Sequence, residues 1–169
     1  LKTKQTILKC NYDFKKYDFL FEGGSAGCTY VFNKSILNVV VKNFDGLEIS
    51  DTTVFSHDWF IYFIARVNKF RIYMSKISHI FYRIHSSNQY GSNKILKISL
   101  ALKGWYFKQS KIFIQVLNRD TIEFYILNKY QKNWFSRIYI LIKYNFNLMR
   151  SPKRFLLMTI ISLMPKKSN

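Results

Sequence analysis

A helix followed by two strands is predicted between Ser56 and His85, and this order of elements constrains the fold more than any other feature of the chain. The helical pattern is made by apolar residues at helical spacing, namely Trp59, Phe60, Phe63, Ile64 and Val67. Two strand patterns rich in Ile, Tyr and Phe then run from Phe70 to Ser75 and from Ile77 to His85. Such strands are expected to return the chain to one sheet edge after the helix.

The ends of this unit carry residues with known positional preferences. Ser56 is a good N-cap for the helix, and Asn68 is expected to end it in the left-handed conformation. Alternation along the second strand places four side chains on one face, those of His79, Phe81, Arg83 and His85. That face leads into a polar loop at residues 86 to 93.

The flanking segments are predicted from the same kinds of signal. Strands are expected from Tyr17 to Glu22 and from Cys28 to Phe32, around a glycine-rich turn without the sequence of a phosphate-binding loop. Asn33 is expected to cap a short helix at residues 34 to 38, and a loop is expected at residues 39 to 51. Further helices are expected at 94–107, 121–149 and 152–164, the last with Ser151 as cap and Pro152 in the first position.

The positive charge of the chain is concentrated after residue 93. The formal net charge of the 169 residues is +18. Residues 94 to 169 contain 15 Lys and Arg against two acidic residues, whereas residues 1 to 93 contain 12 against seven. A segment this basic is expected to meet a polyanion, either the anionic face of a membrane or a nucleic acid. Cys10 and Cys28 have no metal or redox spacing.

Asp58 is the residue of the central unit best placed for proton transfer. It takes the second position of the predicted helix, where the helix dipole favours a negative charge. A fixed, ionised carboxylate at the edge of a sheet can act as a general base. The alternative interpretation is that Asp58 only complements the helix dipole.

Arg83 and His85 form a second candidate group at the end of the last strand. A guanidinium and an imidazole beside the backbone N–H groups of a Ser-Ser-Asn loop suit a phosphate or a pyrophosphate. The alternative is a surface Arg beside a packed His. A zinc site built from His57, His79 and His85 is weakly indicated, because the set has no Cys and no helical His pair.

Three short motifs follow one another in the first 93 residues. They are Gly27-Cys28-Thr29, then His57-Asp58-Trp59, then Tyr82-Arg83-x-His85-x-x-Asn88-x-x-Gly91. In this order and spacing they resemble the second half of family 2 glycosyltransferases, and most closely the bacterial rhamnosyltransferase-like branch that builds surface polysaccharides. The resemblance covers residues 17 to 93.

The resemblance implies a GT-A fold, which is an α/β fold with a Rossmann-like sheet that holds a nucleotide-sugar with a divalent metal, Mn²⁺ or Mg²⁺, and transfers the sugar with inversion. It implies that Asp58 is the catalytic base, with His57 and Trp59 at the acceptor. The alternative for Trp59 is a core tryptophan. The residues that it places at the donor diphosphate are Arg83, His85 and Asn88, with His85 also the candidate metal contact.

The sequence lacks the nucleotide-binding half of that family, with its Asp-Asp-Gly-Ser turn and Asp-x-Asp metal motif. We therefore expect residues 1–93 to be the C-terminal half of a GT-A catalytic domain and residues 94–169 to be a basic amphipathic helical tail. The chain is expected to be a piece of a larger enzyme and inactive alone. The alternative is a basic module without catalysis that binds a membrane surface or a nucleic acid.

The expected partners follow from the same resemblance and from the charge. They are a nucleotide-sugar donor, a saccharide or lipid-linked acceptor, and an anionic membrane surface, with no nucleic acid expected. The expected location is cytoplasmic, peripheral to the inner face of the cell membrane.

Overall fold

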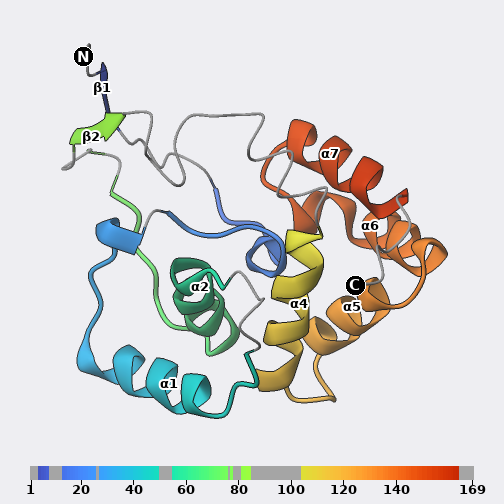
Figure 1. The fold of residues 1–169 in the computed structure, drawn as a ribbon, viewed down its shortest axis with the longest axis horizontal. Helices are drawn as coiled ribbons and strands as arrows, with labels where there is room; N and C mark the ends of the chain where they lie inside the picture. Colours follow the sequence, from blue (N-terminus) through green and yellow to red (C-terminus); the bar gives the residue numbers. More distant parts are fainter. Residues whose placement is uncertain are drawn as a thin grey trace.

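The computed structural model describes residues 4–7, 13–25, 27–49, 55–75, 77, 81–84 and 104–163, with the backbone alone for 4–7 and 81–84. This part of the chain is mainly helical (Figure 1). The helices are α1 (Lys34–Asp45), α2 (His57–Val67), α4 (Trp105–Val116), α5 (Ile122–Gln131), α6 (Trp134–Leu148) and α7 (Pro152–Leu163). Two 3-10 helices, η1 (Asp18–Leu20) and η2 (Gly27–Thr29), and two strands, β1 (Lys4–Ile7) and β2 (Phe81–Ile84), complete the described elements.

The expected half of a Rossmann-like sheet is not seen in the described residues, where β1 and β2 form one antiparallel pair. The strands predicted at 17–22 and 28–32 are wrong, because η1 and η2 occupy these segments, and residues 70–75 form no ladder. A strand pattern needs a neighbouring strand to bond with. The backbone N–H of Tyr17 instead donates to the carbonyl of Asn147, 2.8 Å away, just before α6 ends.

Helix α2 confirms the predicted helix, but both of its ends differ from expectation. The hydroxyl of Ser56 does not cap the backbone and donates to the carboxylate of Asp58 at 2.5 Å. Asn68 has a φ of −84°, because its backbone N–H and its side-chain amide both donate to the carbonyl of Ile64. The left-handed residue is the next one, Lys69, with a φ of 56°.

The other helices follow the predicted caps more closely than the predicted lengths. Asn33 caps α1 through a 3.2 Å bond from the N–H of Ile36, but the helix continues to Asp45 through the predicted loop. The helix expected at 121–149 is divided into α5 and α6, and Asn133 caps the second one. Pro152 begins α7 as predicted. Of the helix expected at 94–107, residues 94–103 lie outside the described part.

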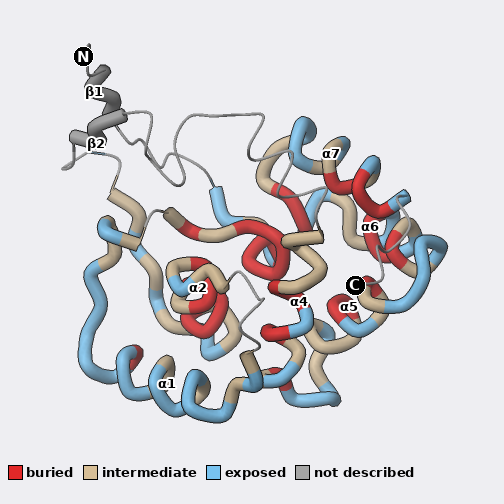
Figure 2. The backbone as a smooth tube through the Cα atoms, viewed as in Figure 1, coloured by how far each residue is buried: buried red, intermediate tan, exposed pale blue. Residues whose placement is uncertain are grey.

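One hydrophobic core joins the elements before and after residue 93. Phe113 of α4 stacks on Phe63 of α2 at 4.1 Å between ring centroids and packs edge-on against Trp59 at 5.1 Å. The same cluster of buried side chains reaches α5, α6 and α7, so the red segments in Figure 2 converge between the helices. The predicted domain boundary falls at residues outside the described part and stays a prediction. No helix in the described part is long and apolar enough to cross a membrane.

Candidate functional site

The N-terminal end of α2 lies against the loop of η2, where two of the three motifs meet. A Cβ atom at Gly27 would lie 3.0 Å from Nε2 of His57 and 3.2 Å from Cβ of Asp58. A side chain at this position would therefore require His57 or Asp58 to shift by a few tenths of an ångström. The absence of a side chain at Gly27 therefore allows the η2 loop to pack closely against the start of α2, and no unusual backbone angle is involved.

Asp58 is held at one of its two carboxylate oxygens. Its half-buried carboxylate accepts hydrogen bonds at Oδ1 from the hydroxyl of Ser56 at 2.5 Å and from the backbone N–H of Trp59 at 2.9 Å. No hydrogen bond from a described residue reaches Oδ2. Since the two bonds fix the orientation of the group, the second oxygen is positioned to accept a proton. His57 beside it is exposed.

Trp59 lies in the hydrophobic core. Its side chain is 2% exposed, and its Nε1 donates to the carbonyl of Phe19 at 2.7 Å. Rings of α4 cover it, including that of Trp105 at 5.1 Å between centroids. This position agrees with the alternative interpretation, a core tryptophan, and gives the predicted acceptor contact no support.

The predicted donor side lies mostly beyond the described side chains. Arg83 is in β2, where its backbone pairs with Gln5 of β1, and His85 and Asn88 lie outside the described residues. Their approach to Asp58 therefore stays a prediction. No three His, Cys, Asp or Glu side chains gather as a metal site within the described ranges.

A cavity of about 550 Å³ opens beside α2. Helix α2 lines it with Ile61, Tyr62 and Ala65. These residues follow Asp58 by three, four and seven positions, so they share its face of the helix. The first residue of α2 that lines the cavity, Ile61, thus follows Asp58 by about one helical turn.

The opposite wall of the cavity combines flat rings with polar groups. The rings are those of Tyr30, Phe32, Phe70 and Tyr73, and the polar side chains are those of Ser25, Thr29, Asn33, Arg71 and Ser75. No carboxylate is among the described residues that line it. Rings and hydroxyl groups of this kind suit a partly polar ligand such as a saccharide or a lipid-linked sugar.

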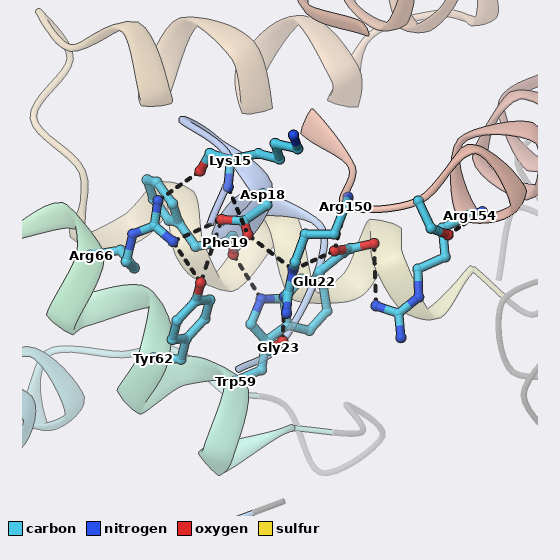
Figure 3. A network of polar contacts seen from close by, with 11 residues as sticks. Lys15, Asp18, Phe19, Glu22, Gly23, Trp59, Tyr62, Arg66, Arg150 and Arg154 are labelled. Atoms are coloured by element: carbon cyan, nitrogen blue, oxygen red, sulfur yellow. Dashed lines mark hydrogen bonds and ion pairs between the residues drawn. The ribbon is translucent and has the colours of Figure 1, made fainter. Parts of the chain in front are cut away.

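A buried network of charges includes Tyr62 and Arg66 of α2, and the sequence analysis missed it (Figure 3). The side chain of Asp18 is fully buried between two guanidinium groups, with Arg66 of α2 at 2.8 Å from Oδ1 and Arg150 at 2.9 Å from Oδ2. Arg150 also lies 2.6 Å from Oε2 of Glu22, and the more exposed Arg154 lies 3.2 Å from Oε1. Buried charges persist when they are paired in this way.

Tyr62 connects this network to the cavity. Its hydroxyl accepts a 2.6 Å bond from Arg66 and donates to Asp18 at 3.4 Å, while its ring lines the cavity. Burial, followed by the negative charge of Asp18, raises the pKa of this hydroxyl well above its ordinary value, although Arg66 and Arg150 act in the opposite direction. The tyrosine therefore remains neutral and keeps its hydrogen bonds over the physiological range.

One signal in the sequence could have revealed the network. Asp18 interrupts an otherwise apolar run from Tyr17 to Phe21 and Glu22 follows it directly, in a chain that has only nine acidic residues. Acidic residues inside such a run are expected to be buried with a basic partner. The partners could not be identified, because the chain offers 27 Lys and Arg residues.

The comparisons with known proteins give one significant relative. The chain is 30% identical over 111 residues to dTDP-rhamnosyl transferase RfbG of Shigella flexneri, a match that covers 63% of this chain and 38% of the relative. The chain thus spans under two fifths of that relative's length. It matches no family model, and no solved structure gives a significant match.

Proposed function

We propose that this chain is the acceptor-side part of an inverting family 2 glycosyltransferase with a GT-A fold, which transfers a sugar from a nucleotide-sugar to a saccharide or lipid-linked acceptor. The product would be a surface polysaccharide. The observation that carries the proposal is the Asp58 carboxylate, which is fixed at Oδ1 and accepts no bond at Oδ2 from a described residue, on a helix that also lines a cavity with aromatic rings. The similarity to a rhamnosyl transferase supports it.

In the proposed reaction, Oδ2 of Asp58 takes the proton from an acceptor hydroxyl. The acceptor oxygen then attacks the anomeric carbon from the face opposite the leaving group, so the configuration inverts. The new C–O bond forms as the bond to the diphosphate breaks, and the nucleoside diphosphate leaves with the electron pair. Ser56 and the N–H of Trp59 keep the carboxylate in place during the transfer.

The cavity along α2 is the proposed acceptor site. Tyr30 and Tyr73 offer flat faces on which sugar rings can pack, and Asn33 and Arg71 offer hydrogen-bond donors. His57, which is exposed and precedes the base in the sequence, is proposed to contact the acceptor at the rim of this site. Trp59 supports the site from the core.

The donor side is proposed to be completed by the nucleotide-binding part of a whole enzyme. Arg83, His85 and Asn88 would face the donor diphosphate there. A divalent metal, Mn²⁺ or Mg²⁺ with His85 as one ligand, would supply charge to the leaving diphosphate. The described residues form no metal cluster, and the steps above assign no action to a metal.

The reaction is proposed to occur at the cytoplasmic inner face of the cell membrane. The basic C-terminal residues support this placement, because anionic lipids attract Lys and Arg near their surface. A basic surface-binding module without catalysis is the second candidate, since the charge alone is compatible with it.

The test is an assay of sugar transfer by a full-length protein that contains this segment. Purified protein is incubated with dTDP-rhamnose and with other nucleotide-sugars, and release of the nucleoside diphosphate is measured with and without polysaccharide and lipid-linked acceptors. We expect acceptor-dependent release. A folded protein that transfers no sugar from any donor of the panel, yet binds vesicles, would favour the second candidate.

A further inference from the structure

Helix α6 carries a row of large apolar side chains on its outer face. Phe135, Tyr139, Ile142 and Phe146 are 65%, 48%, 70% and 81% exposed. Their spacing of four, three and four residues places them along one face. The opposite face of the same helix contributes Ile140 and Leu141 to the core. The helix is therefore apolar on two sides, and only one of them is used by the fold.

Helix α7 repeats this arrangement. Leu156, Ile160 and Leu163 are 61%, 46% and 54% exposed at spacings of four and three residues, while Met158 and Ile161 are buried. The two helices pack against each other at one end of the molecule (Figure 1). The outer rows of α6 and α7 are called the α6–α7 rows below. Exposed apolar surface of this extent marks an interaction site.

The charge around the α6–α7 rows has one sign. Residues 124 to 169 contain nine Lys and Arg residues and no Asp or Glu. Those exposed on the two helices and the turn before α6 are Lys132, Lys143, Lys153 and Arg154, of which Arg154 is also paired with Glu22. Lys143 lies within 5.5 Å of the ring centroid of Tyr139, so a cation stands directly beside the apolar row.

We propose that the α6–α7 rows dock on an anionic lipid bilayer, with the apolar side chains at the level of the head groups and the cations on the phosphates. This inference rests on the membrane part of the proposed function and not on sugar transfer. Helices that lie in a membrane interface typically carry aromatic and aliphatic side chains next to lysines, as α6 and α7 do. A second copy of the chain fits less well, because the same positive surface would face itself.

The binding experiment uses the 169-residue chain and two kinds of vesicle, phosphatidylcholine alone and phosphatidylcholine mixed with phosphatidylglycerol. We expect binding to the mixed vesicles that weakens with salt. Ile142→Ser with Phe146→Ser should lower the partition coefficient roughly tenfold or more, because two large apolar side chains no longer leave water. Lys143→Gln should lower it about fivefold.

The matched control lies on α1, which also exposes aliphatic side chains. Leu37 and Val41 are 43% and 48% exposed, so Leu37→Ser with Val41→Ser removes a similar kind of surface elsewhere. This variant should bind vesicles as the unmodified chain does. Trp134, 44% exposed at the start of α6, gives a second readout. Its fluorescence should shift to shorter wavelength on mixed vesicles, and the shift should disappear in Trp134→Phe.

Each failure has its own meaning. Vesicle binding that is equal in the α6 and α1 variants would overturn the assignment to the α6–α7 rows. An unmodified chain that binds neither kind of vesicle would overturn membrane attachment itself. Dimers that dissociate in the α6 variant, or DNA binding that fully displaces vesicles at physiological salt, would replace the bilayer by another partner. Sugar transfer to a water-soluble acceptor should not change in the α6 variant of the full-length protein, which separates this inference from the proposed catalysis.

Discussion

The Oδ2 atom of Asp18 lies 2.9 Å from Nε of Arg150, in a contact that joins the beginning of the described chain to the turn before α7. Oδ1 of the same carboxylate lies 2.8 Å from Arg66 near the end of α2. One fully buried acidic side chain therefore connects three segments that are remote in sequence. Because α2 begins at His57, next to Asp58, the network also anchors the helix that presents the proposed base.

Asp18→Asn should destabilise the protein strongly. The amide cannot balance two guanidinium groups, and the loss of one member of a buried ion pair costs about 3 to 5 kcal/mol. The measurement is urea unfolding of the 169-residue chain followed by circular dichroism. Asp13→Asn is the matched control, because Asp13 is exposed in the same segment and its change should stay within about 0.5 kcal/mol. Equal effects of the two substitutions would show that the buried network contributes nothing specific.

Gly27→Ala should disturb the site more than the fold. The new methyl group would press on His57 and Asp58, so overpacking of about 1 to 3 kcal/mol is expected, with a loss of sugar transfer in the full-length protein. Gly46→Ala is the control, since nothing lies within 4 Å of the added atom and its φ is −92°. That control should be neutral or stabilising by up to about 1 kcal/mol. Normal transfer by Gly27→Ala would mean that this contact does not position the base.

Tyr130 should make the protein sensitive to alkali. Burial raises the pKa of its hydroxyl from 10.0 to about 12, although Ser162 and Arg137 lower it somewhat. The folded protein keeps a proton on Tyr130 that the unfolded chain loses, so the contribution of this group to stability is constant below pH 10 and falls as the pH rises from about 10 to 12. The slope from this one group is about 1.4 kcal/mol per pH unit.

Urea unfolding at several pH values checks this prediction. Tyr130→Phe removes one ionisable group and should reduce the fall between pH 10 and 12 by about 1.4 kcal/mol per pH unit, while the part due to Tyr62, whose pKa is also raised, remains. The control is Tyr139→Phe, because the pKa of that exposed hydroxyl is lowered by its hydrogen bond with Lys143. Removal of the Tyr139 hydroxyl should leave the decrease in stability between pH 10 and 12 at least as steep as in the unmodified protein. An unchanged slope in Tyr130→Phe would contradict the assignment.

The sequence predicted the features that depend on neighbouring residues. Helix α2, the cap at Asn33 and the start of α7 at Pro152 follow from local spacing and local hydrogen bonds. The segment at 17–22 was read wrongly, because a strand depends on a partner strand, whereas the chain here bonds to Asn147. The role of Arg150 was missed for the same reason, because its partners Asp18 and Glu22 lie far away in the sequence.

The candidate site shows the same division. The place of Asp58 in the first turn of α2 was predicted correctly, because a helix start is a local signal. The difference between its two oxygens was not predictable, because the hydroxyl of Ser56 was expected to bond to the backbone. The cavity was not predictable either, since residues 29–33 meet residues 70–75 only in the folded chain.

Asp58→Asn separates the proposed base from a residue that only complements the helix dipole. In the full-length protein the amide can accept the same bond from Ser56 but cannot accept a proton. Turnover should therefore fall by about 10²-fold or more, while the melting temperature and the donor affinity remain near those of the unmodified protein. Asp58→Glu should recover little activity, because one more methylene group misplaces the oxygen.

Ser56→Ala tests the other half of the arrangement, the bond that holds Oδ1. The carboxylate remains but rotates more freely, so turnover should fall less than in Asp58→Asn, by roughly tenfold, with the donor affinity again unchanged. Turnover and donor affinity are measured separately, by release of nucleoside diphosphate and by calorimetry. Near-normal turnover in Asp58→Asn with an unchanged melting temperature would leave Asp58 with a role at the helix terminus alone. In that case Ser56→Ala should also be silent, because the bond would then orient a group that takes no part in the transfer.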